Sequence, residues 1–194
     1  MVAGGFEPPG LAGSGWVTRS GGIWTERCCT ISPWRLRFGT MPRVYLDACC
    51  VNRPFDDQSQ GRVRLEAEAV LLTVSLFGQP DWIWIGSSVL RFELAKNPDP
   101  DRRAQAETFA RGVQVWVALG AVETGRATEL EALGFATFDA LHLASAESGR
   151  ADLFLTTDDA LLRVARRHPS ALRVRIMNPL SWFEEFAEHD QDNG

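Results

Sequence analysis

The sequence predicts an α/β fold in which a central, mainly parallel β-sheet is covered by helices on both faces, a three-layer α/β/α sandwich. Short apolar runs rich in β-branched and aromatic residues, typical of buried strands, recur from Arg43 onward. Longer segments with apolar residues at helical spacing separate these runs, and strands joined by helices pair in parallel. No internal repeat is present, so we expect one domain over residues 41–186.

The first half of this region contains two apolar runs and three helical segments. RVYLD is short and β-rich, and DWIWIGSS alternates Trp with Ile before Gly86 closes it, so both are expected to be strands. Apolar residues at helical spacing predict a long helix between them, and NPDP separates two further helices. The expected helices are 63–77, SVLRFELAK and 101–117.

The second half continues the alternation of strands and helices. GAVETG is expected to form a short strand and turn, and the apolar runs ADLFLTT and LRVRIM are expected to be the last two strands. The expected helices are 126–133, 137–148, DDALLRVARR and PLSWFEEF.

The two ends of the chain differ from this pattern. Residues 1–40 are dense in Gly, Pro, Ser and Trp without a sustained period, so we expect them to be disordered or an artefact of the gene model, with Met41 as the natural start. Residues 187–194 form a polar, acidic tail that we expect to be flexible.

Composition excludes several classes of protein. A net charge of −5 argues against a basic coat that binds nucleic acid without regard to sequence. No apolar run approaches the length of a membrane span, and the N-terminus lacks the apolar segment of a secretory signal. The cysteines occur as two adjacent pairs without the spacing of a zinc knuckle, so we expect reduced thiols and a cytoplasmic protein.

Four acidic residues occupy positions where functional groups of parallel sheets gather, at the carboxyl ends of strands or on the helices that follow. Asp47 ends the first strand, Glu93 lies in the helix after the second, Asp139 opens a helix, and Asp158 follows the strand ADLFLTT. Converging carboxylates repel one another unless a cation neutralises them, and Mg²⁺ prefers oxygen ligands. This set therefore favours metal-assisted hydrolysis of a phosphodiester.

Residues 43 to about 186 also resemble a PIN-domain ribonuclease of the toxin–antitoxin (VapC-like) type. Four segments carry the resemblance in the right order, each with one of the acids: YLDACCVNR, SSVLRFELAK, TFDALHLASA and FLTTDDALL. The last segment is similar to the family's Thr-x-Asp motif, with Thr156 and Asp158 in its two positions. No single segment is specific, whereas four in order are.

The resemblance implies a PIN-like α/β/α fold and endonucleolytic cleavage of RNA with Mg²⁺ or Mn²⁺ as cofactor. Asp47, Glu93, Asp139 and Asp158 would be the catalytic and metal-binding residues. The family also implies a homodimer that a small antitoxin protein neutralises.

One departure from the family pattern lies directly after Asp47. The family carries a hydroxyl or amide residue one or two places after this aspartate, where this chain has Ala48 and Cys49. The departure leaves open a PIN-like scaffold that binds RNA or a protein partner without cleaving it.

Each acid also has a purely structural interpretation. Asp47 could merely end its strand, Glu93 could be a solvated charge, and Asp139 could only favour the dipole of its helix. For the fourth position Asp158 competes with Asp159, and the motif spacing favours Asp158.

Other polar residues near the acids have several possible roles. Asn52 and Arg53 could contact a phosphate or hold their loop, and Thr156 is either a substrate contact or, preferably, a hydrogen bonder at a strand end. His142 lies three residues after Asp139, but Mg²⁺ has little affinity for imidazole, so a packed or hydrogen-bonded structural role is favoured. Asp56 and Asp57 are expected in a solvated turn.

RNA binding requires cations because phosphates dominate its affinity. The arginines expected near the site are Arg102, Arg103, Arg163, Arg166 and Arg167, each of which could equally be a solubilising surface charge. Trp82 and Trp84 alternate with isoleucines in a strand and are predicted to be core residues rather than a base-stacking platform.

Other enzyme classes lack their motifs. A haloacid-dehalogenase-type phosphatase would need Asp-x-Asp at the first strand, but Cys49 stands two places after Asp47. A P-loop would need a Gly-rich turn ending in Lys and Ser or Thr, and a thiol redox site would need Cys-x-x-Cys. None of these occurs.

Overall fold

The computed structural model describes residues 42–191. The expected N-terminal extension, residues 1–40, lies outside the described residues, as do Met41 and residues 192–194. Within residues 42–191 no helix has both the length and the apolar character needed to cross a lipid bilayer.

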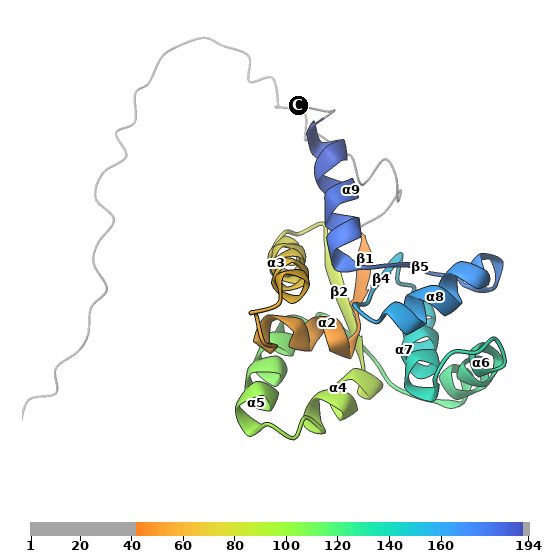
Figure 1. Cartoon of the computed structure of the whole chain (residues 1–194). Helices are drawn as coiled ribbons and strands as arrows, with labels where there is room; N and C mark the ends of the chain where they lie inside the picture. Colours follow the sequence, from red (N-terminus) through yellow and green to blue (C-terminus); the bar gives the residue numbers. More distant parts are fainter. Residues whose placement is uncertain (1–41, 192–194) are drawn as a thin grey trace, which may run out of the picture. The chain divides into compact units, whose positions relative to one another are not determined.

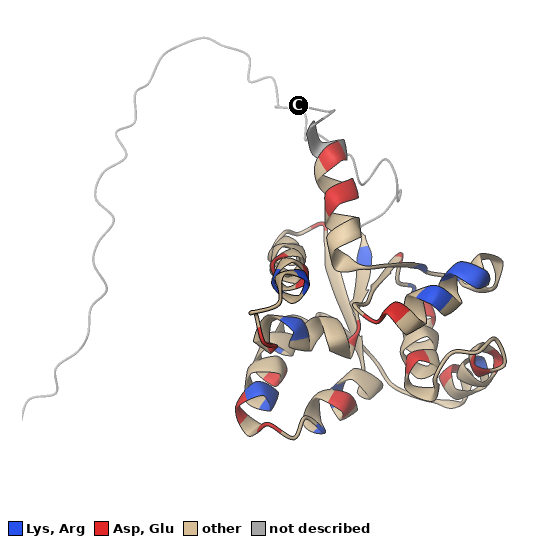
Figure 2. Cartoon of the chain, in the orientation of Figure 1, with Lys and Arg blue, Asp and Glu red and all other residues tan. Residues whose placement is uncertain are grey.

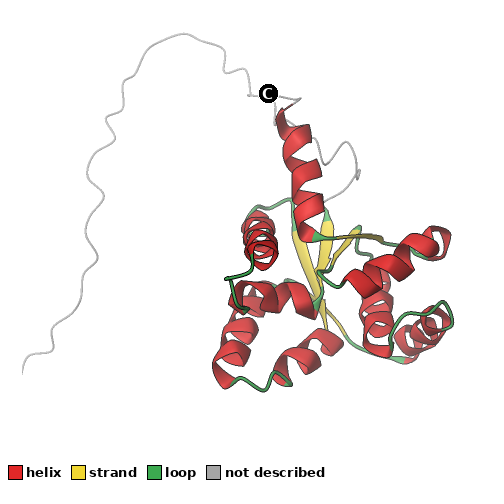
Figure 3. Cartoon of the chain, in the orientation of Figure 1, coloured by secondary structure: helices red, strands yellow, loops and turns green. Residues whose placement is uncertain are grey.

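A five-stranded parallel sheet forms the middle layer (Figures 1 and 3). Its order is β3-β2-β1-β4-β5, and every neighbouring pair is parallel. The strands are β1 (Arg43–Leu46), β2 (Ile83–Ser87), β3 (Val115–Val117), β4 (Leu153–Leu155) and β5 (Arg175–Met177). Because β1 is central and pairs with both β2 and β4, the residue that follows it lies in the middle of the carboxyl edge.

Within residues 42–191, eight α-helices cover the two faces of this sheet. In chain order they are α2 (Ala48–Asn52), α3 (Gly61–Leu76), α4 (Ser88–Ala95), α5 (Pro100–Phe109), α6 (Ala121–Glu131), α7 (Thr137–Ser148), α8 (Asp159–Arg167) and α9 (Pro179–Gln191). Three short 3-10 helices, Arg53–Phe55, Ala110–Gly112 and Pro169–Ala171, lie in the connections.

The alternation of side chains along β1 divides the core into two parts. Val44 and Leu46 point into one cluster with residues of α2, α3, α4, α5 and α9. Tyr45 points into the other, formed with α6, α7 and α8. The predicted three-layer α/β/α sandwich with a parallel sheet is thus confirmed.

The alternating tryptophans, Trp82 directly before β2 and Trp84 on β2, belong to the first cluster, as their pattern indicated. Trp82 and Trp84 are 4% and 0% exposed. Trp84 stacks on Phe77 and meets the edge of Phe109, with ring centroids 5.2 and 5.7 Å apart. These rings therefore stabilise the core and present no surface to a base.

The segment between α5 and α6 differs from the sequence prediction. We expected a helix over 101–117 and a strand at GAVETG, but α5 ends at Phe109, the strand is β3, and GAVETG begins α6. The β-branched residues of VWV favour a strand, and pairing with β2 stabilises it. The carboxylate of Glu123 accepts from the backbone N–H of Gly120 at 2.9 Å and so begins the helix at that glycine.

The last helix is longer than predicted. The expected boundary of the flexible tail, at residue 187, lies inside α9, which continues to Gln191.

Candidate metal centre and active site

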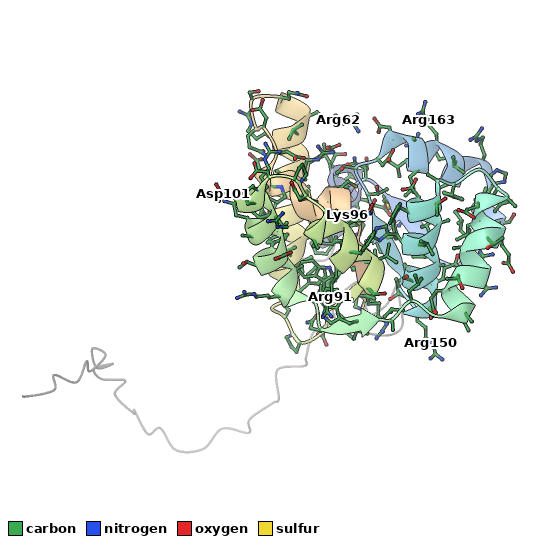
Figure 4. All side chains as sticks on the ribbon, turned by 90° about the horizontal axis from the view of Figure 1, so that it is seen from below. Arg62, Arg91, Lys96, Asp101, Arg150 and Arg163 are labelled. Carbon is green, nitrogen blue, oxygen red and sulfur yellow. The ribbon has the colours of Figure 1, made fainter. Side chains whose placement is uncertain are left out.

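The four acids predicted from the sequence line one open cavity of about 400 Å³. Asp47 lies between β1 and α2, Glu93 on α4, Asp139 in the first turn of α7, and Asp158 between β4 and α8. These elements meet at the carboxyl edge of the sheet, towards which Figure 4 looks from below. Segments 111 residues apart in sequence, 47 to 158, are therefore brought together by the parallel topology.

Asp47 is held in one orientation by its neighbours. It is the N-cap of α2, and its Oδ1 accepts from the backbone N–H of Ala48 at 2.7 Å. Its Oδ2 accepts from the Thr156 hydroxyl at 2.9 Å and from the Cys49 thiol at 3.2 Å. With 5% of its surface exposed, Asp47 is a buried carboxylate with three donors.

Cys49 takes up the position where the family pattern has a polar residue. Its sulfur accepts from the backbone N–H of Thr157 at 3.2 Å while its thiol faces Asp47. Thr156, whose hydroxyl accepts from the backbone N–H of Asp158 at 3.0 Å, supplies the remaining donor to the Asp47 carboxylate. The departure at Ala48 and Cys49 thus leaves Asp47 hydrogen-bonded.

Glu93 is anchored by a chain of buried polar side chains. His142 Nε2 lies 2.6 Å from Glu93 Oε2, and His142 Nδ1 lies 2.7 Å from the Tyr45 hydroxyl. The Tyr45 hydroxyl in turn lies 2.6 Å from the hydroxyl of Ser87, which accepts from the backbone N–H of Leu90. This chain joins β1, β2 and α4 to α7 and orients the Glu93 carboxylate.

The charge on His142 depends on its acidic neighbours. Burial would lower the pKa of His142, but the hydrogen bond to Glu93 and the charges of Asp47 and Asp139 outweigh it, so the pKa is raised. Burial raises the pKa of Tyr45, which stays a neutral hydroxyl. With Nε2 donating to Glu93, His142 serves as the positioning group that the sequence favoured.

One atom each from Asp47, Glu93 and His142 lies within 4.8 Å of the others, a spacing that fits a metal ion. Hard divalent cations such as Mg²⁺ prefer carboxylate oxygens to imidazole. Because both nitrogens of His142 are within hydrogen-bond distance of other side chains, the carboxylates are the better ligands.

The surroundings of Asp139 disfavour its charged form. Burial and the negative charges of Asp47, Asp158 and Glu93 raise its pKa to about 6. Its side chain makes no hydrogen bond to the described residues, and α7 has no side-chain N-cap. Asp139 therefore does not serve as a side-chain cap, and burial among other carboxylates disfavours its charged form.

Asp158 and Asp159 are adjacent in sequence but have different surroundings. Asp158 lines the cavity and is the N-cap of α8, its Oδ1 accepting from the N–H groups of Ala160 and Leu161. Asp159 forms a two-armed ion pair with Arg62 at 2.7 Å and does not line the cavity. The structure thus places Asp158, the residue that the motif spacing favoured, with the other acids.

The three residues expected to bind substrate lie close to the cavity. They differ in whether their polar groups already have partners within the protein. Thr156 is fully buried and bonded to Asp47, and Arg53 is tied to Asp56, Glu66 and Thr157. Both therefore have structural partners in place of a free contact with substrate. Asn52 lines the cavity, with its amide bonded to the Ala48 carbonyl and to Asn97.

Positive charge lies mainly away from the acids. Helix α8 begins with acidic residues and carries arginines along its length, as Figure 2 shows. Arg102 and Arg103 are engaged with neighbouring acids or carbonyls around Asn97 and Asp99. Among the described residues that line the cavity, Lys96 is the one cation.

Sequence reasoning did not assign the supports of Glu93 or the role of Lys96. Tyr45 lies on β1, two places before Asp47, which follows this strand, and Ser87 ends the neighbouring strand β2. Lys96 is the single lysine of the sequence and lies three residues after Glu93, on the same side of its helix. These spacings were visible signals, although only the fold connects them to the acids.

Comparisons with known proteins find structural resemblance but no match in sequence. No family model and no curated protein matches the chain. A solved structure similar to it is described as the crystal structure of VapBC2 from Rickettsia felis bound to a DNA fragment from their promoter. The match has 15% sequence identity and a TM-score of 0.47, and it covers 70% of this chain and 98% of the other.

Proposed function

We propose that this protein is a Mg²⁺- or Mn²⁺-dependent endoribonuclease that hydrolyses phosphodiester bonds of RNA. The observation that carries the proposal is the convergence of four carboxylates on one open cavity that Lys96 alone of its described lining residues offsets. The raised pKa of Asp139, caused by burial and by the neighbouring carboxylates, supports the presence of a cation at this place.

The residues present fit a hard divalent ion. Asp47, Glu93, Asp139 and Asp158 offer carboxylate oxygens around space for water and phosphate oxygens, the ligand set that Mg²⁺ and Mn²⁺ accept. Such an ion, when bound, makes a water more acidic and stabilises the negative charge that develops during phosphodiester hydrolysis.

The chain itself supplies orientation. Thr156 and Cys49 hold the carboxylate of Asp47, and His142 holds that of Glu93, so two acids keep their geometry when substrate enters. The cavity is open to solvent, and Asn52 and Lys96 in its lining offer polar groups to a substrate.

We infer further that the protein is the toxin of a toxin–antitoxin pair, a cytoplasmic homodimer neutralised by a small antitoxin. Support for this part comes from the four segments that resemble the PIN-domain family, in the order that the family has them. Induced expression is expected to arrest growth, and the Asp47→Asn variant is expected to restore it. A toxic Asp47→Asn variant would show that growth arrest does not depend on the site.

A matched pair of neighbouring acids tests the nuclease directly. With Mn²⁺, the Asp158→Asn variant is expected to lose cleavage of single-stranded RNA, whereas Asp159→Asn is expected to retain it. Addition of EDTA should abolish cleavage by the wild-type chain. A wild-type chain that binds Mn²⁺ weakly and cleaves nothing would instead indicate the non-catalytic scaffold.

A further inference from the structure

Two exposed phenylalanines stand beside the cavity, one directly before each of two site acids. Phe92 precedes Glu93 on α4, and Phe138 precedes Asp139 on α7. Consecutive helical residues point about 100° apart, so each acid can face the cavity while its aromatic neighbour faces the adjoining surface. The side chains remain 47% and 40% exposed, unusual for phenylalanine.

The two rings form a near-parallel pair. Their centroids are 5.9 Å apart and their planes differ by 10°, so the rings of Phe92 and Phe138 stack nearly parallel while each keeps part of its surface exposed to solvent. We refer to these two residues as the aromatic pair. It spans α4 and α7 on the solvent side, as the Glu93–His142 contact spans the same helices in the interior.

Lys96 connects the aromatic pair to the acids. Its ammonium lies 4.1 Å from the ring centroid of Phe92 and 6.0 Å from that of Phe138, and the same residue lines the cavity of Asp139. Figure 4 shows Lys96 near the middle of this face, between the groups of helices on either side. A flat apolar surface, a cation and a carboxylate cluster thus adjoin one another.

We propose that the aromatic pair and Lys96 form a nucleotide subsite for single-stranded RNA, a proposal that rests on the proposed nuclease function. A nucleobase next to the scissile phosphate stacks on the aromatic pair, and Lys96 moves from the ring to a neighbouring phosphate. Stacking on aromatic side chains is how proteins commonly hold unpaired bases, because every base has a flat face. Because Lys96 is a cation, this surface favours an occupant that carries negative charge, such as RNA, over an apolar protein partner.

The first experiment measures steady-state cleavage of a labelled single-stranded oligoribonucleotide with Mn²⁺. Phe92→Ala and Phe138→Ala are each expected to raise KM by about 5- to 100-fold with little change in kcat. Phe92→Leu, which retains apolar bulk against Phe138, should show most of this loss because it lacks an aromatic face. Leu71→Ala is the matched control, since Leu71 is 49% exposed on α3 and belongs neither to the aromatic pair nor to the lining of the cavity.

The second experiment removes the base instead of the ring. Wild-type KM should rise when the oligoribonucleotide is abasic at the nucleotide beside the cleaved bond, and Phe92→Ala should cause little further loss on that substrate. Lys96→Ala should lower the slope of log KM against log salt by about 0.7, the release expected for one phosphate contact of a single strand, and Lys96→Arg should preserve the slope.

The outcomes distinguish failure of the subsite proposal from failure of the proposed nuclease function. A wild-type chain that cleaves RNA while the phenylalanine variants keep its KM overturns the subsite alone. The subsite is also overturned if the loss in Phe92→Ala is the same on intact and abasic RNA, which would make the aromatic pair a structural contact between helices. Unchanged RNA cleavage together with loss of a co-expressed antitoxin would assign the surface to a protein. A wild-type chain that neither cleaves nor binds RNA overturns both proposals.

Discussion

Asp47 and Asp139 face the same cavity but have opposite relations to the protein around them. Asp47 accepts three hydrogen bonds, from Ala48, Thr156 and Cys49, which hold its side chain in place. Asp139 has no such donor among the described residues and is surrounded by other carboxylates that raise its pKa to about 6. Hydrogen bonds from the fold hold Asp47, whereas a bound cation would stabilise the charge of Asp139. The difference indicates that folding and metal binding place opposing demands on the site.

The largest effects are expected from removing either charge. Asp47→Asn and Asp139→Asn should each reduce RNA cleavage by roughly a thousandfold or more, because each removes a carboxylate from the proposed metal site. Single-turnover cleavage with saturating RNA and Mn²⁺ measures this loss. Near-wild-type cleavage by either variant would show that the site has been chosen wrongly.

The same two variants should differ in stability when EDTA removes metal. The folded-state pKa of Asp139 exceeds the ordinary aspartate value of 3.8, so the favourable contribution of this carboxyl to stability is present below pH 4 and lost as pH rises through about 6. The loss is at most about 3 kcal/mol, less where water screens the charges. Asp139→Asn should therefore exceed the wild-type free energy of unfolding at pH 7, whereas Asp47→Asn should fall below it.

Urea unfolding at pH 5 and pH 7 distinguishes the two cases. The advantage of Asp139→Asn should shrink towards pH 4, where the wild-type carboxyl is itself protonated. Equal destabilisation by both variants at pH 7 would contradict the contrast between the two acids.

The affinity for metal should depend on pH through the protonation of Asp139. A bound cation displaces its proton, so the affinity for Mn²⁺ should fall by up to about tenfold for each pH unit below 6 and level off above pH 7. Isothermal titration at several pH values measures the slope, and Asp159→Asn, which alters an acid outside the cavity, should keep it. A flat affinity between pH 5 and 7 would show that the Asp139 proton is not linked to the metal.

Smaller effects are expected from the donors to Asp47. Thr156→Val removes a hydroxyl that bridges Asp47 and the N–H of Asp158, so it should cost about 1–3 kcal/mol of stability. Thr156→Ser retains the hydroxyl and should recover most of it. Cys49→Ser should change Mn²⁺ affinity by roughly threefold or less, because a serine hydroxyl can donate to Asp47 as the thiol does. A larger loss in Cys49→Ser would show that the sulfur has a specific role.

The sequence by itself determined the fold class and the set of acids. The alternation of strands and helices predicts parallel strands, and the position of each acid relative to a strand places it at the carboxyl edge. The same logic failed between α5 and α6, where local helical spacing favoured a helix through VWV although pairing with β2 makes this segment a strand. Boundaries of this kind depend on partners distant in sequence.

Only the tertiary structure decided the partners of each acid. Asp158 and Asp159 are adjacent and chemically alike, yet one caps α8 at the cavity and the other pairs with Arg62 from α3. Likewise, the contacts of His142 with Tyr45 and Glu93 join residues 97 and 49 positions apart. Hydrogen bonds and charge interactions act over a few ångströms in space, whereas sequence patterns report the direction of a side chain within its own element. Because the parallel sheet brings the carboxyl ends of its strands together, side-chain directions within separate elements become contacts in space.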